Sequence, residues 1–161
     1  MSDKNVKSTS PSSVAYVQLD DAINFAAAIM AGQGVSADHA AIIAECLVEA
    51  DLRGVQTHGL SRLPVYVERV QRGLVNGTPE MKLDKPVAAC ASLDGDNAFG
   101  FLVGRRAMQE AIAMAETCGV GVVAARNSNH FGMAATYLLQ AVKAGYFAFV
   151  FTNASKAMPP W

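Results

Sequence analysis

The chain has few cysteines, and they follow no recognisable pairing pattern. Its three cysteines, Cys46, Cys90 and Cys118, lie far apart and form no C-x-x-C motif. An odd number of widely spaced thiols argues against a disulfide framework, and the missing motif argues against a zinc ribbon. Free thiols are typical of a reducing compartment, so we expect a cytoplasmic protein.

The sequence also lacks an excess of charge of either sign and any long hydrophobic run. Thirteen basic residues face fourteen acidic ones, which leaves no electrostatic footprint for nucleic acid or for an anionic membrane. The longest apolar stretches, such as residues 146–151, are too short to cross a bilayer. Residues 1–13 carry Ser, Thr and Pro in place of an apolar signal segment, and we predict that they form a disordered tail.

The residues before position 80 predict a mainly helical subdomain that spans residues 14–80. Apolar side chains recur there at three- and four-residue spacing, as on the buried face of a helix. Ser36 and Ser61 precede two of these patterns and are the expected N-caps. The predicted elements are a short strand at 14–19 and helices at about 20–33, 37–53 and 60–72.

Residues 81–161 predict the first part of an α/β domain. Turn-forming residues at 76–79 separate this part from the helical subdomain. Apolar strands are expected to alternate with helices, which is typical of a sheet with parallel strands. The predicted order is strand 86–93, turn 94–97, helix 99–117, strand 120–125, helix 133–144 and strand 146–152.

His58 is the first of two histidines that lie among small, turn-forming residues, where a side chain can reach a ligand. An imidazole titrates near neutrality and can protonate a carbonyl oxygen that receives a hydride. The hydroxyl of Thr57 can orient the ring. Arg62 and Tyr66 follow at four-residue spacing on one helix face, and a guanidinium can hold a carboxylate through two hydrogen bonds.

The same residues allow plainer interpretations. Arg62 could be a surface residue that pairs with Glu68 or with solvent, since solvated charged faces are common. Tyr66 could lie at the edge of the core of an amphipathic helix. His39, within the second predicted helix, has no partner motif and is interpreted as a surface histidine.

His130 is the second histidine in such a stretch. It follows the predicted strand 120–125 and precedes a helix, and ligands of open α/β sheets bind beside the carboxyl ends of strands. The backbone N–H groups of residues 131–135 can bind a phosphate at the start of that helix, with Gly132 allowing close approach. Alternatively, Asn129 and His130 cap the helix and hydrogen-bond the loop.

Two common site motifs are missing. Gly95, Gly100 and Gly104 do not have the spacing of the Rossmann fingerprint or of a P-loop. A nicotinamide cofactor, if bound, would therefore be held in a different way. No cluster of His, Asp and Glu has metal-ligand spacing, so we expect no metal.

Taken together, the motifs resemble the malate/L-lactate dehydrogenase family of NAD(P)-dependent reductases, which is unrelated to the Rossmann-fold lactate dehydrogenases. The resemblance covers nearly everything after the N-terminal tail, and four motifs occur in the same order. They are residues 53–59 with Arg62 and Tyr66, Asp94-Gly95 leading into Gly100, residues 126–132, and Thr152-Asn153 ahead of Pro159-Pro160-Trp161.

The resemblance implies a non-Rossmann α/β fold and an oxidoreductase that transfers a hydride between NAD or NADP and a small 2-oxo or 2-hydroxy acid. It also implies a homodimer. The site residues that it implies are His58 as proton donor oriented by Thr57, His130 with a possible acid/base share, Arg62 and Tyr66 as substrate ligands, and a cofactor-binding set of Phe131, Gly132, Met133, Ala134, Ala135, Thr152 and Asn153.

Members of this family are considerably longer than the present chain. The resemblance therefore predicts a C-terminally truncated member with an incomplete fold and exposed apolar surface. A non-catalytic fragment or association module is the alternative to an enzyme, and an anion-binding module at the helix after His130 is a third. Which substrate is used, and whether the cofactor is NAD or NADP, stay open.

Overall fold

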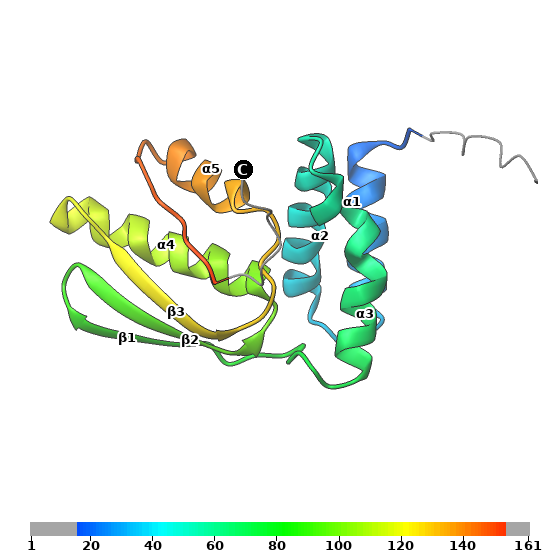
Figure 1. Ribbon diagram of the computed structural model, residues 1–161, viewed down its shortest axis with the longest axis horizontal. Coiled ribbons are helices and arrows are strands. Elements are labelled where there is room, and N and C mark those ends of the chain that lie inside the picture. Colours follow the sequence, from blue (N-terminus) through cyan, green and yellow to red (C-terminus); the bar gives the residue numbers. More distant parts are fainter. Residues whose placement is uncertain (1–15, 154–161) are drawn as a thin grey trace, which may run out of the picture.

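The computed structural model describes residues 16–153, which fold into a helical flank and a sheet-containing flank (Figure 1). Three helices stand side by side on the first flank. On the second, a long helix lies along a three-stranded sheet, with a shorter helix against it. This mixed α/β architecture was expected. Its elements are α1 (Leu19–Ala31), α2 (Ala37–Leu52), η1 (Gln56–His58), η2 (Leu60–Arg62), α3 (Leu63–Gln71), β1 (Lys82–Val87), β2 (Cys90–Ala98), α4 (Gly100–Cys118), β3 (Val122–Ser128) and α5 (Ala135–Lys143).

Two helix ends follow directly from local chemistry. The hydroxyl of Ser36 caps α2, because it accepts a hydrogen bond from the backbone N–H of His39 at 3.4 Å, as predicted. Helix α4 ends at Gly119, whose φ of 77° lies in the left-handed region that glycine enters without strain. The periodicity of α2 is also confirmed, since Ala40, Ile43, Ala44, Leu47 and Val48 are all buried.

The third helix is shorter than predicted. Residues Leu60–Arg62 form a 3-10 turn, and the α-helix begins only at Leu63. Ser61 does not cap this helix, which corrects the prediction. Its hydroxyl instead donates to the carbonyl oxygen of Gln56 at 2.8 Å and so closes the turn that carries His58.

The sheet is mixed, whereas parallel strands were predicted. Strands β2 and β3 are parallel, but β1 and β2 form an antiparallel hairpin, in the order β1-β2-β3. The predicted strand at 86–93 runs across the two-residue turn of this hairpin. A link this short can join only antiparallel strands, and its residues, Ala88 and Ala89, are not turn-forming residues that the sequence pattern could reveal.

The predicted turn at 94–97 belongs to strand β2. Asp96 and Asn97 lie at φ values of 50° and 56°, so the backbone is locally irregular there. Asp94 holds this segment against β3, because its Oδ1 accepts hydrogen bonds from Asp96 N–H and from the Asn127 side chain, each at 3.0 Å. The strand continues through the irregularity to Ala98.

Two predicted strands are absent from the part of the chain that the structure describes. Residues 16–18 have no regular structure ahead of α1, and residues 146–153 form no strand. Alternating apolar residues become a strand only where a neighbouring strand pairs with them, and these segments have no such neighbour among residues 16–153. Positions 14 and 15, the predicted tail at 1–13 and residues 159–161 lie outside the described residues.

One main hydrophobic core joins the two flanks. It contains buried residues of all three N-terminal helices together with Leu93 of β2 and residues of α4. Tyr66 of α3 meets the rings of Phe99 and Phe101 edge-on, with centroids 5.9 and 5.3 Å apart. The helical flank is thereby fixed against the start of α4. The proposed division of the chain near residue 80 stays a prediction.

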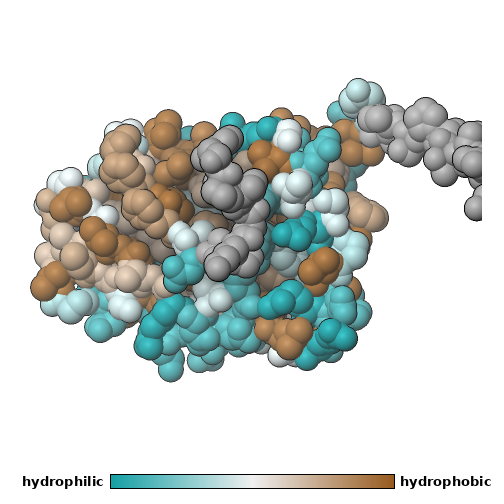
Figure 2. Space-filling view, in the orientation of Figure 1, coloured by the Kyte–Doolittle hydropathy of each residue, from teal (hydrophilic) through white to brown (hydrophobic). Residues whose placement is uncertain are grey.

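The second flank exposes apolar side chains, as expected. Phe147, Phe149 and Phe151 are 84%, 70% and 87% exposed, and Val122 and Val142 are exposed as well. Figure 2 shows hydrophobic residues gathered on the side of the molecule that carries α5, above a hydrophilic lower edge. Among the described helices, none is long and apolar enough to span a membrane.

Candidate active site

His58 lies on the short turn between α2 and α3. Its ring Nδ1 is 3.0 Å from the hydroxyl oxygen of Thr57, so the expected contact between the two side chains is present. The residue is half-buried, while Thr57 is exposed. The ring is thus held from one side and reachable from the other.

Asp51, a residue that the sequence reasoning missed, anchors this turn. Its Oδ2 accepts a hydrogen bond from the backbone N–H of Leu60 at 2.8 Å. Gly59 packs so closely on the same carboxylate that a Cβ atom at this position would overlap it. The glycine next to His58 is therefore required for close approach. The detectable signal was a carboxylate in the last turn of α2 just ahead of the motif.

His130 lies in the loop between β3 and α5. Its Nδ1 is 2.8 Å from the hydroxyl of Tyr66 and 3.3 Å from the backbone N–H of Gly132. The N–H group can only donate, so Nδ1 acts as an acceptor. The neutral ring then carries its proton on Nε2.

The two histidines meet although they are far apart in the sequence. Their rings stack with centroids 5.5 Å apart and planes 21° apart. The carboxyl end of β3 brings His130 to the helical flank, as its position after a strand predicted. The two motifs therefore form one site.

The surroundings of His130 and Tyr66 favour their neutral forms. Partial burial lowers the pKa of His130 below 6.5, and the positive charges of Arg62, His58 and Arg69 lower it further. Burial raises the pKa of Tyr66 to about 12, against the opposing effect of Arg62 and Arg69. At neutral pH the hydrogen bond between them joins two uncharged groups.

Arg62 is half-buried, and the pairing with Glu68 that the plainer interpretation offered is not formed. Glu68, its proposed partner, instead forms an ion pair with Arg72 at 3.3 Å. The Nε atom of Arg62 is buried and has no hydrogen-bond partner among the described residues. A guanidinium with unused donors beside two imidazoles can bind an anion.

Tyr66 combines the two interpretations that the sequence left open. It is buried, with 3% of its surface exposed, and it packs in the core against Phe99 and Phe101. Its hydroxyl nevertheless reaches the site, where it binds His130. The side chain thus links the core to the histidine pair.

Asn129 and His130 do not cap the following helix, which excludes that part of the alternative. Helix α5 has no side-chain cap, and its N-cap residue is Ala134. The side chain of Asn129 points elsewhere: its Nδ2 donates to the carbonyl oxygens of Asn97 and Ala98, both at 3.0 Å. The alternative is right in one respect, because the backbone N–H of Gly132 donates to the His130 ring within the loop.

The segment 131–135 lies beside the histidine pair. Gly132 is buried at a φ of 71°, and a Cβ atom there would overlap the ring of Phe101. The ring of Phe131 stacks on Tyr137, whose hydroxyl donates to the carbonyl oxygen of Phe131. Within the described residues, the N–H groups of Met133, Ala134 and Ala135 make no hydrogen bond.

Thr152 and Asn153 are not brought to this site. Both are exposed and lie in an irregular segment. The only hydrogen bond of Thr152 within residues 16–153 goes to the carbonyl oxygen of Asn153. No described contact joins either residue to the histidines.

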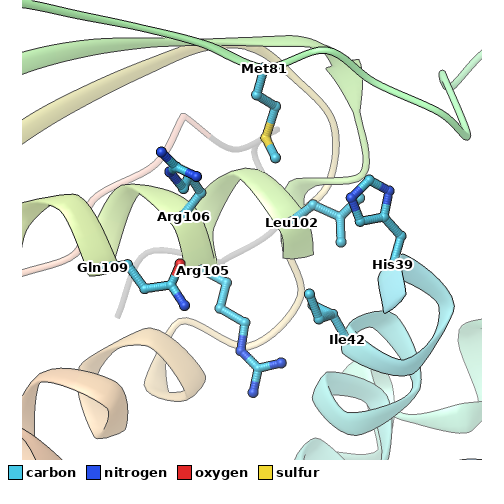
Figure 3. Close-up of a pocket in the computed structure, with 7 residues that line it drawn as sticks. All are labelled: His39, Ile42, Met81, Leu102, Arg105, Arg106 and Gln109. Atoms are coloured by element: carbon cyan, nitrogen blue, oxygen red, sulfur yellow. The ribbon is translucent and has the colours of Figure 1, made fainter. Parts of the chain in front are cut away.

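A cavity of about 170 Å³ lies elsewhere, between α2 and α4 (Figure 3). It contains none of the site residues, and its two arginines, Arg105 and Arg106, are already paired with Glu45 and Glu110. His39 lines this cavity and is half-buried. Nowhere in residues 16–153 do three or more His, Cys, Asp or Glu side chains form a group able to hold a metal ion.

Known proteins resemble this chain in both sequence and structure. The family model described as malate/L-lactate dehydrogenase matches residues 17–161. The malate dehydrogenase of Pyrococcus abyssi is 38% identical over 147 residues, which cover 90% of this chain and 41% of that protein. The L-sulfolactate dehydrogenase of Methanocaldococcus jannaschii is 41% identical over 128 residues, which cover 80% and 37% of the two chains.

A solved structure shares the fold as well. The malate dehydrogenase of Pyrococcus horikoshii OT3 matches with a TM-score of 0.78 and 41% identity, over 80% of this chain and 37% of that one. The chain thus spans about two fifths of the length of the curated relatives that it matches. On the match of the family model to nearly its whole length, the chain belongs to the malate/L-lactate dehydrogenase family.

Proposed function

We propose that this chain carries the acid/base part of an NAD(P)-dependent dehydrogenase that acts on a small 2-oxo or 2-hydroxy acid. The observation that carries the proposal is the stack of His58 on His130 beside Arg62, whose buried Nε has no hydrogen-bond partner within residues 16–153. A proton donor next to an anion ligand is what reduction of a 2-oxo acid requires. The names of the relatives, malate and sulfolactate dehydrogenases, support this class of substrate.

In this reaction, His58 protonates the oxygen of the substrate carbonyl, and Thr57 orients its ring. Arg62 holds the substrate carboxylate through its free N–H groups. We assign the proton to His58 because partial burial and nearby positive charges lower the pKa of His130 and so disfavour its protonated form. His130 then donates a hydrogen bond from Nε2 to the substrate oxygen.

Tyr66 was expected to bind the substrate directly. Its hydroxyl already binds His130 at 2.8 Å, so we propose that it acts on the substrate through that ring. The hydrogen bond from Tyr66 fixes the tautomer of His130 and directs Nε2–H away from the core. Tyr66 is therefore a positioning residue in this scheme.

The residues of the segment 131–135 fit a nicotinamide cofactor. NAD(H) or NADP(H), when bound, supplies or accepts the hydride. The N–H groups of Met133, Ala134 and Ala135 at the start of α5 make no hydrogen bond within residues 16–153 and suit a phosphate oxygen. Gly132 itself packs against the ring of Phe101, and its contact with the cofactor stays a prediction. Thr152 and Asn153 keep a predicted contact with the cofactor, and a homodimer is part of the proposal.

The test uses a chimaera in which residues 1–161 are continued by the remaining C-terminal part of the Pyrococcus abyssi enzyme. We expect it to oxidise NADH or NADPH with a 2-oxo acid such as oxaloacetate or pyruvate. His58→Ala should lower kcat by about a hundredfold or more, because it removes the general acid. Arg72→Met, at an exposed ion pair on α3, is the control.

Binding to this chain alone gives a second measurement. Oxamate, a 2-oxo acid analogue, should shift the NMR signals of the His58 ring and of the Arg62 side chain. Arg62→Met should abolish these shifts, and Arg72→Met should leave them unchanged. The proposal is wrong if a folded chimaera is inactive on all 2-oxo acids and cyclic imino acids.

A second candidate is a non-catalytic association module. The exposed Phe147, Phe149 and Phe151 favour it, since contiguous apolar surface is typical of an interaction site. This second candidate predicts that the chain forms a complex through this apolar surface. It also predicts that oxamate leaves the NMR signals of the histidines unchanged.

A further inference from the structure

Arg69 lies on α3, one helical turn after Tyr66, and points to the same loop. Its Nη2 donates to the side-chain oxygen of Asn129 at 2.8 Å, in a part-buried hydrogen bond between residues 60 positions apart. Among the described residues it forms no ion pair. Its charged guanidinium thus donates to a neutral amide and not to a carboxylate. This suggests that Arg69 serves to position Asn129.

Asn129 uses its whole side chain to join three elements. Its Nδ2 donates to Asn97 Oδ1 at 2.9 Å and to the carbonyl oxygens of Asn97 and Ala98 at 3.0 Å. Its Oδ1 accepts from Arg69 of α3. The backbone N–H of Asn129 also donates to the carbonyl oxygen of Ala98, at 3.2 Å. The residue directly before His130 is therefore tied both to the end of β2 and to the helical flank.

Two successive turns of helix α3 thus contact two neighbouring residues of the loop. Tyr66 binds His130, and Arg69 binds Asn129. A single hydrogen bond allows a ring to pivot, whereas a second anchor on the neighbouring residue fixes the backbone. The same helix follows directly on the turn of His58, so it serves as a common base for both histidines.

We propose that Arg69 is a positioning residue that, through Asn129, holds His130 at stacking distance from His58. The catalytic meaning of this role rests on the proposed function, but the geometry can be tested without any activity. Without Arg69, Asn129 keeps its contacts to β2 and loses its contact to α3. The loop then stays attached to the sheet-containing flank and can shift relative to the helical flank.

The experiment measures contact between the two rings in this chain by NMR. The chain has three histidines, so the ring signals can be assigned by single His→Gln variants. Arg69→Met should lose the nuclear Overhauser cross-peak between the His58 and His130 rings. It should also raise the pKa of His130, because a positive charge and part of the ring's burial are removed.

Two variants make the result decisive. Arg72→Met removes an exposed arginine just after the last residue of α3 and should leave the cross-peak and the pKa unchanged. Arg69→Lys keeps a donor and a charge and should restore the cross-peak in part. The proposal is overturned if folded Arg69→Met keeps the wild-type cross-peak, or if Arg69→Met and Arg69→Lys both unfold, since Arg69 would then serve only stability.

The outcome is separable from that of the proposed function. If the cross-peak depends on Arg69 but oxamate does not bind to wild type, the positioning role stands and the dehydrogenase assignment fails. If oxamate binds and the cross-peak survives in Arg69→Met, only the positioning role is lost.

Discussion

The turn that carries His58 and the loop that carries His130 each hold a histidine in the site, but they are stabilised by different kinds of contact. The His58 turn is built from neighbours in the sequence: Thr57 is adjacent to it, and the Asp51 anchor lies 9 positions from Leu60. The His130 loop is built from distant residues, with Tyr66 64 positions away and the Asn97 contacts of Asn129 32 positions away. The contacts of the His58 turn therefore join residues close in the sequence, whereas those of the His130 loop form only when distant parts of the chain come together.

This difference has a consequence for stability. A turn held by short-range contacts needs little of the tertiary structure, whereas a loop held by two other elements, α3 and β2, opens when either of them moves. Substitutions that push the His130 loop off the backbone of its neighbours should therefore act on more than one element. Those at the anchors of the His58 turn should act locally.

The largest effect is expected from Gly100→Ala. A Cβ atom there would overlap the carbonyl oxygens of Asn129 and His130, which are backbone atoms that cannot rotate away. The free energy of unfolding should fall by about 3 kcal/mol, measured by chemical denaturation. Gly77→Ala, whose Cβ would lie 3.5 Å from a Val35 side-chain atom, is the control and should change little.

Gly59→Ala makes the comparison sharper. Its Cβ would meet the Asp51 side chain, which can turn aside at the cost of its hydrogen bond to Leu60. The free energy of unfolding should therefore fall by less than it does for Gly100→Ala. An equal or larger loss would contradict the distinction between a local turn and a tertiary loop.

Asp51→Ala comes next in size. It leaves the N–H of Leu60 without its partner, which should cost about 2 kcal/mol of unfolding free energy. Hydrogen exchange should become faster at Leu60 and stay slow at Asn129. Asp51→Asn keeps an acceptor, so its free energy of unfolding should fall by less. Asp38→Ala, at the exposed first turn of the same helix, is the control and should lower the free energy of unfolding by about 0.5 kcal/mol. Faster exchange at Asn129 would show that the turn is not independent.

Tyr66→Phe should have a smaller effect of about 1 kcal/mol, since it removes one hydrogen bond and keeps the packing of the ring. The ¹⁵N signals of His130 should shift toward the Nδ1-protonated tautomer, because only the longer hydrogen bond from Gly132 N–H, at 3.3 Å, then favours a proton on Nε2. The His58 signals should not move. An unchanged His130 tautomer would contradict the role given to the Tyr66 hydroxyl.

The same contrast explains what the sequence could predict. The Ser36 cap and the Thr57–His58 contact depend on residues a few positions apart, and both were predicted. The antiparallel hairpin was missed because Ala88 and Ala89 give no turn signal. Arg69 and Asp51 were missed because an arginine or a carboxylate on a helix is most often solvated, and only the folded chain shows which partner it meets.

The smallest effect is a pH dependence of stability that comes from His130. Its pKa in the folded chain lies below the value of 6.5 expected when unfolded, so the unfolded chain takes up the proton first as the pH falls. The free energy of unfolding should therefore decrease as the pH falls from about 6.5 to the folded pKa, and should not depend on this group above that range. Because the residue is exposed to solvent, which screens these charges, the decrease should be small. Denaturation curves of wild type and His130→Gln across this range should have different pH slopes, with the shallower slope in the variant. Parallel curves would mean that partial burial and the nearby charges of Arg62, His58 and Arg69 do not lower the pKa of His130 in the folded chain, and the tertiary half of the comparison would then lose its electrostatic support.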